Sequence, residues 1–261
     1  MKINQDGKGN SSYSRIAIIT GATSGIGEAL AKKFVSSGFG VIGNARNSSK
    51  LLALEIELGD AFFGVEGDAS HSAVIEKMFE AAVTQFGKSP DIVLVNAGRG
   101  LGGSVSQADV SKFEEILMLN VKGALALMQM AANRMVESQR IGFPNLAADI
   151  IVIGSVVGRH VSPFSAVYGA TKFAVHGLAE GLRREVGPKG VRVTLVEPGI
   201  VISGFQDAAG YDDAQVTHFE NEFGPLLDAH DVANSIHFVV MQPPHVHISD
   251  IMIRPTRQDY P

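Results

Sequence analysis

The stretch IAIITGATSGIG, residues 16–27, decides the fold. Its first five residues are apolar and mostly β-branched, which predicts a buried strand. Glycines follow at the spacing G-x-x-x-G-x-G, and a helical pattern begins at Gly25. Glycine lets a ligand approach the backbone, and the start of a helix directs free N–H groups at an anion. The stretch therefore predicts a phosphate-binding turn, with a ligand-free tight turn as the alternative. The turn residues are Gly21, Thr23, Ser24, Gly25, Ile26 and Gly27.

Short apolar runs alternate with helix-length segments along the rest of the chain. This alternation predicts an α/β fold: a single-domain, doubly wound parallel sheet of about seven strands with helices on both faces. Ligands of such sheets bind beyond the carboxyl ends of the strands. The expected strands are Ile16–Thr20, Gly40–Gly43, Ala61–Val65, Ile92–Val95, Ile150–Ile153, Val191–Val196 and Ile248–Ile253. The expected helices are Gly25–Ser37, Ser48–Leu58, Ser72–Phe86, Asp109–Glu137, Pro163–Val186 and Ala229–Val240.

Composition excludes several classes of function. The chain has 261 residues, a formal net charge of −5 and no cysteine, so we expect no nucleic-acid partner, no Cys nucleophile and no thiolate metal site. Residues 1–14 are polar and are expected to form a flexible tail before a domain at 15–261. The apolar stretch Ile116–Met135 is interrupted by polar residues, among them Asn120, Lys122, Gln129 and Arg134, which favours a buried helix over a membrane span. We expect a cytoplasmic protein.

The ends of the second and third expected strands bear on cofactor choice. An acid near the end of the second strand binds the ribose hydroxyls of NAD, whereas an Arg accommodates the 2′-phosphate of NADP. This chain has Ala45 and Arg46 there, which favours NADP(H) over NAD(H), with a solvated surface Arg as the alternative. After the third strand, Asp68, followed by Ala69, either accepts from an adenine amino group or caps the next helix.

A phenol and an ammonium group are spaced for acid–base chemistry. Tyr168 and Lys172 lie four residues apart, so in a helix they share one face. A neighbouring ammonium favours the phenolate and lowers the pKa of a tyrosine, which prepares it as a general acid/base. Ser155 follows the fifth strand and is placed to polarise a substrate carbonyl. Asn120 either anchors a water or carbonyl group, or is a satisfied buried amide.

Taken together, these residues resemble the short-chain dehydrogenase/reductase family from about residue 15 to residue 257. The resemblance implies a Rossmann-type fold and hydride transfer between a nicotinamide and a carbonyl or alcohol carbon. Tyr168 would be the acid/base, Lys172 would lower its pKa and hold the nicotinamide ribose, Ser155 would orient the substrate oxygen, and Asn120 would support a water-linked proton relay. The carrying motifs are Thr20-Gly21-x-x-x-Gly25-Ile26-Gly27, Asn96-Ala97-Gly98, Asn120, Ser155, Tyr168-x-x-x-Lys172 and Pro198-Gly199.

The same resemblance implies the rest of a cofactor site and marks three departures. Asn96, Ala97, Gly98, Pro198, Gly199, Ile200 and Ser203 would line the cofactor path, and family members are commonly tetramers. The usual double Asn is Val95-Asn96, Ser203 replaces Thr, and residues 139–148 form an expected surface-loop insertion. The closing segment 251–258 is similar to NADP-dependent hydroxy-acid (serine-type) dehydrogenases and the clavulanate-forming aldehyde reductase.

Substrate choice is expected to reside in loops after the fourth to sixth strands, including a loop at about 199–225 with a possible lid at 204–224. Arg99 and Arg159 either bind a substrate carboxylate, which makes the substrate a small hydroxy or keto acid, or face solvent. The candidate substrate residues are Arg99, Arg159, His160, Phe164, Phe205 and Tyr211.

Two alternatives to this interpretation stay open. One is a catalytically silent dinucleotide-binding regulator or scaffold, which would not need the phenol–ammonium pair. The other is an epimerase or dehydratase of the same family. His245 and His247 would share a strand face, but lack further ligands at a metal-binding spacing, so we expect no metal.

Overall fold

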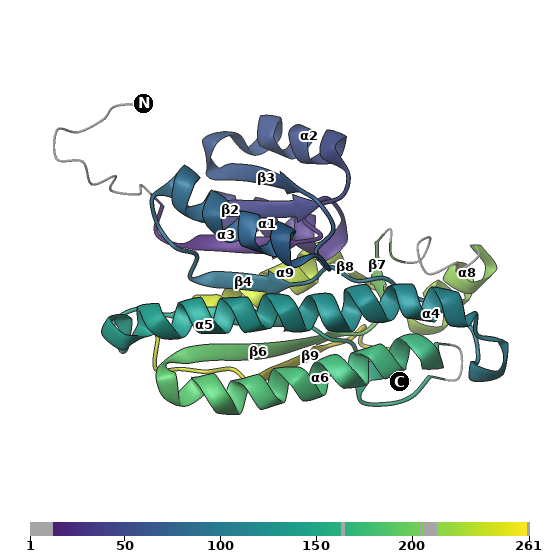
Figure 1. Cartoon of the computed structure of the whole chain (residues 1–261). Coiled ribbons are helices and arrows are strands. Elements are labelled where there is room, and N and C mark those ends of the chain that lie inside the picture. The colour runs from purple at the N-terminus through teal and green to yellow at the C-terminus, as the bar shows by residue number, and fades with distance from the viewer. Residues whose placement is uncertain (1–12, 163–164, 204, 206–212, 260–261) are drawn as a thin grey trace, which may run out of the picture.

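A seven-stranded parallel sheet forms the centre of the protein, in the order β3-β2-β1-β4-β5-β6-β9 (Figure 1). The computed structural model describes residues 13–162, 165–203, 205 and 213–259. The expected doubly wound α/β fold with about seven strands is confirmed. The strands are β1 (Ile16–Thr20), β2 (Gly40–Ala45), β3 (Phe62–Glu66), β4 (Ile92–Val95), β5 (Ala148–Ile153), β6 (Val191–Pro198) and β9 (Asp250–Ile253).

Helices cover both faces of the sheet and enclose two apolar cores. One core joins the sheet to α3, α5 and α6, and the other joins it to α1, α2 and α9. The five inner strands, β2, β1, β4, β5 and β6, are buried at every position, which explains why they are continuous apolar runs rather than alternating ones. The helices are α1 (Gly25–Ser36), α2 (Ser48–Leu58), α3 (Ser72–Phe86), α5 (Ala124–Gly142), α6 (Ala166–Val186) and α9 (Ala229–Val240).

The helix expected over residues 109–137 is divided. It consists of α4 (Val110–Leu117), a π-helical turn η3 (Met118–Gly123) and α5. Length and composition alone would let Val110–Gly142 cross a membrane, but 44% of its most apolar window is buried and α5 packs on the sheet. Its apolar face therefore belongs to the core. The expected 139–148 loop is shorter than predicted, because residues up to 142 are helical and Ala148 begins β5.

A network of buried charges ties together the amino ends of four strands. Asp149 is fully buried and accepts two hydrogen bonds from Arg192, at 2.7 and 2.8 Å, and one from Arg15 at 2.8 Å. Arg15 also pairs with Asp91 at 3.0 Å. Arg192 donates to backbone oxygens beyond α9, among them that of Gln242 at 2.9 Å. This network stabilises the edge of the sheet opposite to the carboxyl ends of the strands.

The chain after β6 contains elements that the sequence pattern did not predict. Strands β7 (Val201–Ile202) and β8 (Leu227–Asp228) pair in a small second sheet, and helix α8 (Asp213–Phe223) lies between them in sequence. These elements fall within the expected loop at 199–225, of which residues 204 and 206–212 lie outside the described residues.

Two local expectations need correction. His245 and His247 precede β9 rather than sharing a strand face, and Nε2 of His247 lies 2.8 Å from the backbone oxygen of Val193. Of the expected tail, residues 1–12 lie outside the described residues. Tyr13, however, packs edge-on against Phe86, with ring centroids 5.3 Å apart, so it belongs to the folded domain.

Candidate active site

A cleft of about 700 Å³ opens at the carboxyl ends of β1, β4, β5 and β6. This is the edge at which doubly wound sheets bind ligands. Predicted site residues from five separate segments meet there. Those lining the cleft are Gly21, Ser24, Gly25, Ile26, Asn96, Ala97, Gly98, Ser155, Tyr168, Lys172, Pro198, Gly199, Ile200 and Ser203.

The turn after β1 is shaped to receive a phosphate group. Gly21 and Gly25 have φ values of +68° and +52°, which other residues rarely adopt. A Cβ at Gly21 would lie 2.8 Å from Nδ2 of Asn96, so the turn also needs glycine for space. Ser24 precedes α1 but makes no side-chain cap, so nothing there competes for the first N–H groups of the helix. These features fit the pyrophosphate of a dinucleotide.

Thr20 and Asn96 join the ends of β1 and β4 beneath this turn. The Thr20 hydroxyl donates to the Leu94 oxygen at 3.0 Å and accepts the Asn96 N–H at 3.0 Å. Asn96 Nδ2 donates to the Thr20 oxygen at 2.8 Å. The single Asn therefore holds the turn in place. Gly27 also lies under the turn, and a Cβ there would overlap the backbone oxygen of Gly21.

The residues expected to select the cofactor follow β2 and β3 but do not line the cleft. Arg46 is exposed, and its charge helps to lower the pKa of Asp68. The larger cause of that lowering is a backbone hydrogen bond: the Asp68 carboxylate accepts the Ser70 N–H at 2.8 Å. The Asp68 side chain therefore stabilises the turn before α3, although His71 occupies the N-cap. Neither Thr23 nor the buried Ala69 lines the cleft.

Tyr168 and Lys172 share the cleft-facing side of α6. Nζ of Lys172 lies 5.7 Å from the centre of the Tyr168 ring and donates to the Ile153 oxygen at 2.7 Å. Burial lowers the pKa of Lys172 to about 8, because the ammonium group loses its hydration. This hydrogen bond joins α6 to the end of β5. The amine thus stands beside the phenol, as the spacing predicted.

Ser155 lies two residues beyond the end of β5 and is held by its neighbours. Its hydroxyl accepts from the Val157 N–H at 3.4 Å and reaches the Pro198 oxygen at 3.5 Å. Its own N–H donates to Nε2 of His176 at 3.3 Å. Because the backbone fixes Ser155 on both sides, its hydroxyl has a defined position at the cleft.

His176 lies one further turn along α6 from Lys172 and fills a pocket made by two glycines. A Cβ at either Gly154 or Gly158 would overlap the imidazole ring. Burial lowers the pKa of His176 to about 4, with Lys172 and Arg159 adding to the effect. The ring is therefore neutral near pH 7, and its Nε2 can accept the Ser155 N–H.

Arg159 does not have the position expected of a substrate-binding residue. Its guanidinium pairs with the fully buried Glu197, at 2.6 Å from Oε1, and with Asp250 at 3.2 Å. The Glu197 carboxylate needs this partner, since an unpaired buried charge is costly. Glu197 also lies 3.8 Å from Nδ1 of His176. Arg159 thus neutralises the buried Glu197 carboxylate and does not line the cleft.

Asn120 lies in the π-helical turn, outside the cleft lining. Its Oδ1 accepts the Arg99 N–H at 2.9 Å, and its Nδ2 donates to the Arg99 oxygen at 2.9 Å and to the Thr171 hydroxyl at 3.2 Å. Thr171 in turn donates to the Tyr168 oxygen at 2.8 Å. These contacts fit both sequence alternatives, because the amide is buried with its hydrogen bonds satisfied and it also anchors the carbonyl group of Arg99. Asn120 therefore links the loop after β4 to the helix that carries Tyr168.

The closing segment of the chain packs under the loop after β6. Oε1 of Gln258 accepts the Ile200 N–H at 3.0 Å, and the Gly199 N–H donates to the Ile253 oxygen at 2.7 Å. A Cβ at Gly199 would overlap the Gln258 amide, so a larger residue here would displace this side chain. Across the cleft, Ser203 lies against Gly25, with 3.3 Å between its Cβ and the position of a Cβ on Gly25.

Aromatic side chains form the outer wall of the cleft. The Phe205 ring centre lies 5.5 Å from that of Tyr168, and Phe219 and Phe223 of α8 complete the wall. Of the other predicted substrate residues, Arg99 and His160 do not line the cleft. Phe164 and Tyr211 lie outside the described residues.

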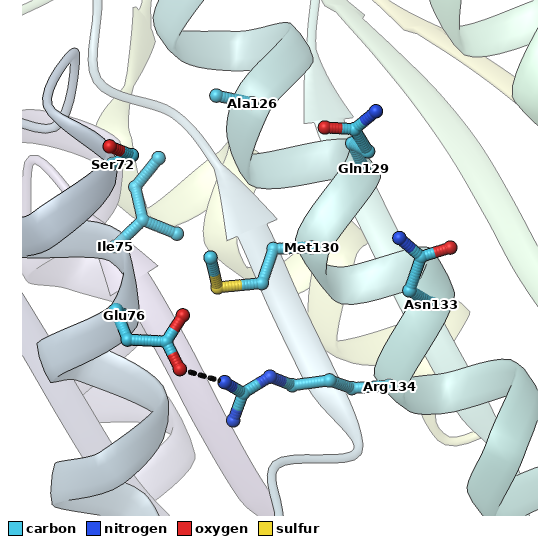
Figure 2. A pocket seen from close by; sticks show the side chains of 8 residues that line it. All are labelled: Ser72, Ile75, Glu76, Ala126, Gln129, Met130, Asn133 and Arg134. Atoms are coloured by element: carbon cyan, nitrogen blue, oxygen red, sulfur yellow. Dashed lines mark hydrogen bonds and ion pairs between the residues drawn. The ribbon is translucent and has the colours of Figure 1, made fainter.

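A smaller hollow of about 290 Å³ lies between α3 and α5, away from these residues. Figure 2 shows Arg134 reaching across it to pair with Glu76. The Arg134 guanidinium also lies 4.8 Å from the centre of the Phe79 ring, so the hollow is bridged by a stabilising pair. Within the described ranges, no group of three or more His, Cys, Asp or Glu side chains gathers to hold a metal.

Sequence reasoning missed His176, Gln258 and the aromatic residues of α8. His176 could have been found, because it repeats the four-residue spacing that joins Tyr168 to Lys172. Gln258 lay inside the closing segment but had no assigned role, since its contact with Ile200 spans 58 positions of sequence.

Comparison with known proteins agrees with this arrangement. The family model described as short chain dehydrogenase matches residues 15–213. An uncharacterized oxidoreductase of Staphylococcus aureus is 31% identical over 242 residues, which cover 92% of this chain and 97% of the relative.

Solved structures give the same result. The closed form of a serine dehydrogenase complexed with NADP+ superposes with a TM-score of 0.85 and 31% identity, over 94% of this chain and 96% of the other. A 3-ketoacyl-(acyl-carrier-protein) reductase from Brucella melitensis, complexed with NADH, gives a TM-score of 0.84 at 26% identity, over 95% and 99%. The chain belongs to the short-chain dehydrogenase/reductase family of oxidoreductases.

Proposed function

We propose that this protein is an NADP(H)-dependent oxidoreductase that interconverts a carbonyl group and an alcohol on a small substrate. The observation that carries the proposal is the meeting of Ser155, Tyr168 and Lys172 in one cleft that begins at a glycine-rich, uncapped helix start. When bound, NADPH supplies the hydride for carbonyl reduction and becomes NADP+.

The side chains divide the remaining work. The Ser155 hydroxyl orients the substrate oxygen, and the Tyr168 phenol gives that oxygen its proton as the carbonyl double bond breaks. Lys172, 5.7 Å from the phenol ring, stabilises the phenolate that is left. A proton from solvent then restores the phenol, with Asn120 supporting the relay through its contacts to the Arg99 loop.

Preference for NADP(H) over NAD(H) rests on the end of β2. Ala45 stands where an acid would bind the adenosine ribose, and Arg46 beside it is exposed and forms no ion pair with a carboxylate among the described residues. An exposed guanidinium suits the doubly charged 2′-phosphate.

We propose a homotetramer acting in the cytoplasm. Exposed apolar side chains on neighbouring helices support self-association: Leu117, Met118 and Leu125 on the α4–α5 stretch, and Phe173 on α6. The cysteine-free sequence is in keeping with the cytoplasm.

The test compares wild type with Tyr168→Phe in NADPH-linked reduction of aldehydes and ketones. We expect the variant to lose at least about 1000-fold in kcat, because it removes the proton donor, while its Kd for NADPH stays within threefold. Unchanged turnover in Tyr168→Phe would refute the proposed acid/base. Tight NADPH binding by wild type without turnover of any substrate would instead support a silent dinucleotide-binding protein.

A further inference from the structure

The outer half of the cleft is built from apolar side chains. Beyond Tyr168, its described lining includes Val156 and Val157 from the turn after Ser155, and aromatic residues from the chain after β6. Phe219 and Phe223 stack one turn apart on α8, with ring centres 6.3 Å apart. A wall of this kind stabilises a bound ring or branched chain by excluding water from it.

The basic side chains near this half of the cleft are engaged by other protein groups. Lys172 is the one Lys or Arg among its described lining residues, and its amine donates to the Ile153 oxygen. Arg159 is bound by Glu197 and Asp250. Arg257 donates to backbone oxygens near the end of α8, at 3.1 Å for Gly224.

Helix α8, which contributes Phe219 and Phe223 to this wall, carries charge of the opposite sign. It contains Asp213, Glu220 and Glu222 and no Lys or Arg. Among the described lining residues, a substrate carboxylate would therefore find no arginine partner, and it would meet the negative charge of this helix.

Taking the proposed reductase function as given, we infer that the substrate is an uncharged aromatic or branched apolar aldehyde or ketone, or the matching alcohol, and not a hydroxy or keto acid. The neutral hydroxyls of Ser155, Ser162 and Ser165 lie in the same lining and suit a single carbonyl oxygen. The reaction balances as before: the carbonyl, NADPH and one proton give the alcohol and NADP+.

The first test uses benzoylformate and its methyl ester, which share a ring and a keto group and differ in one negative charge. We expect kcat/KM with NADPH to be at least about tenfold higher for the ester, a difference of about 1.4 kcal/mol. Equal values, or a higher value for the acid, would overturn the inference while leaving the reductase function intact.

The second test changes the wall. Phe219→Ala should raise KM for the ester about tenfold and leave kcat/KM for propanal, which is too small to need the wall, within twofold. Phe238→Ala is the matched control, because Phe238 is exposed on α9 and does not line the cleft. If Phe219→Ala does not fold, Phe219→Leu gives the same comparison with a smaller effect. An equal loss on both substrates would contradict an aromatic substrate site.

The third test introduces a positive charge at the wall of the cleft. His218 is exposed on α8 and lines the cleft, so His218→Arg should raise kcat/KM for benzoylformate severalfold and not for its ester. No gain for the acid would mean that this wall does not contact the substrate, which counts against the inference.

If neither benzoylformate nor its methyl ester is reduced, a binding experiment tests the ligand class separately from the reductase function. Calorimetry on the NADP+-loaded protein would compare acetophenone with benzoate. Tighter binding of acetophenone keeps the ligand class while the reductase proposal fails, and tighter binding of benzoate overturns the ligand class itself.

Discussion

Nε2 of His176 lies 3.3 Å from the backbone nitrogen of Ser155 and accepts its N–H. The imidazole therefore links the helix that carries Tyr168 and Lys172 to the residue that faces them. Since the ring is held neutral, with a pKa of about 4, this contact persists at working pH. His176 does not line the cleft, so it is a positioning residue.

Replacing His176 should slow the reaction without weakening cofactor binding. His176→Leu leaves the Ser155 N–H without an acceptor, a loss worth about 1–3 kcal/mol, and we expect kcat to fall about tenfold with the KM for NADPH unchanged. His176→Gln retains an acceptor and should recover kcat to within about threefold of wild type. Steady-state kinetics on the three proteins measure both effects.

Acid unfolding provides an independent check on the same histidine. Its pKa of about 4 in the folded protein lies below its ordinary value of 6.5, so the unfolded chain binds the proton more readily between these two pH values. Wild type should therefore lose stability, relative to His176→Gln, as the pH falls from 6.5 to 4. Failure of Gln to rescue kcat, together with parallel acid unfolding, would reject the positioning role.

Lys172 should make the wild-type protein less stable near neutral pH than at high pH. Its pKa is about 8 in the folded protein against 10.5 unfolded, so the charged amine opposes folding fully below pH 8 and not at all above 10.5. This cost is roughly 3 kcal/mol. Lys172→Met removes it, so the variant's stability relative to wild type should be clearly higher at pH 7 than at pH 10.

Urea unfolding of both proteins at the two pH values gives this difference directly. The comparison cancels the titration of other groups, provided that they behave alike in both proteins. The variant should also be inactive, which would show that the buried charge is retained for function. A stability difference that does not change with pH would contradict the assignment.

Asn120 should stabilise the link between the loop after β4 and α6. Asn120→Ala leaves the backbone N–H and oxygen of Arg99 without their partners, and we expect a loss of about 1–3 kcal/mol in unfolding free energy and a lower kcat. Asn133→Ala, at an exposed site on α5, should change stability by less than about 0.5 kcal/mol. Similar denaturation midpoints for the two variants would argue against this link.

The charge network at the amino ends of the strands should govern stability and not activity. Asp149→Asn leaves Arg192 buried without a full counter-charge, which typically costs about 3–5 kcal/mol. Glu180→Gln, which breaks exposed pairs with Arg183 and Arg184, should have little effect. At a temperature where Asp149→Asn remains folded, kcat should match wild type. A marked fall in kcat there would show that the two edges of the sheet are coupled.

Local patterns predicted the sheet and the central residues of the site because each depends on a short stretch of sequence. Buried strands such as β1 are continuous apolar runs, and Tyr168 and Lys172 meet through the geometry of a single helix. The carboxyl-end rule then gathered residues from different strands at one edge, as the cleft shows.

Contacts between distant segments could not be predicted in this way. The sequence leaves Arg159 open to a substrate carboxylate, because nothing near it in sequence shows that Glu197 and Asp250 pair with it. The π-helical turn at Met118–Gly123, which divides the long helix, likewise could not be predicted from the helical spacing of the apolar residues. The aromatic wall could not be predicted, because α8 falls within an expected loop and only the tertiary fold places Phe219 and Phe223 at the cleft.

The pocket that Gly154 and Gly158 form for the His176 ring also constrains how this enzyme can be altered. A side chain introduced at either glycine has room only if the imidazole is replaced by something smaller, so the three positions act as one unit of variation. Libraries that randomise the turn after β5 alone will return mostly misfolded clones. Libraries that change residue 176 together with the glycines can alter the position of Ser155 without this clash.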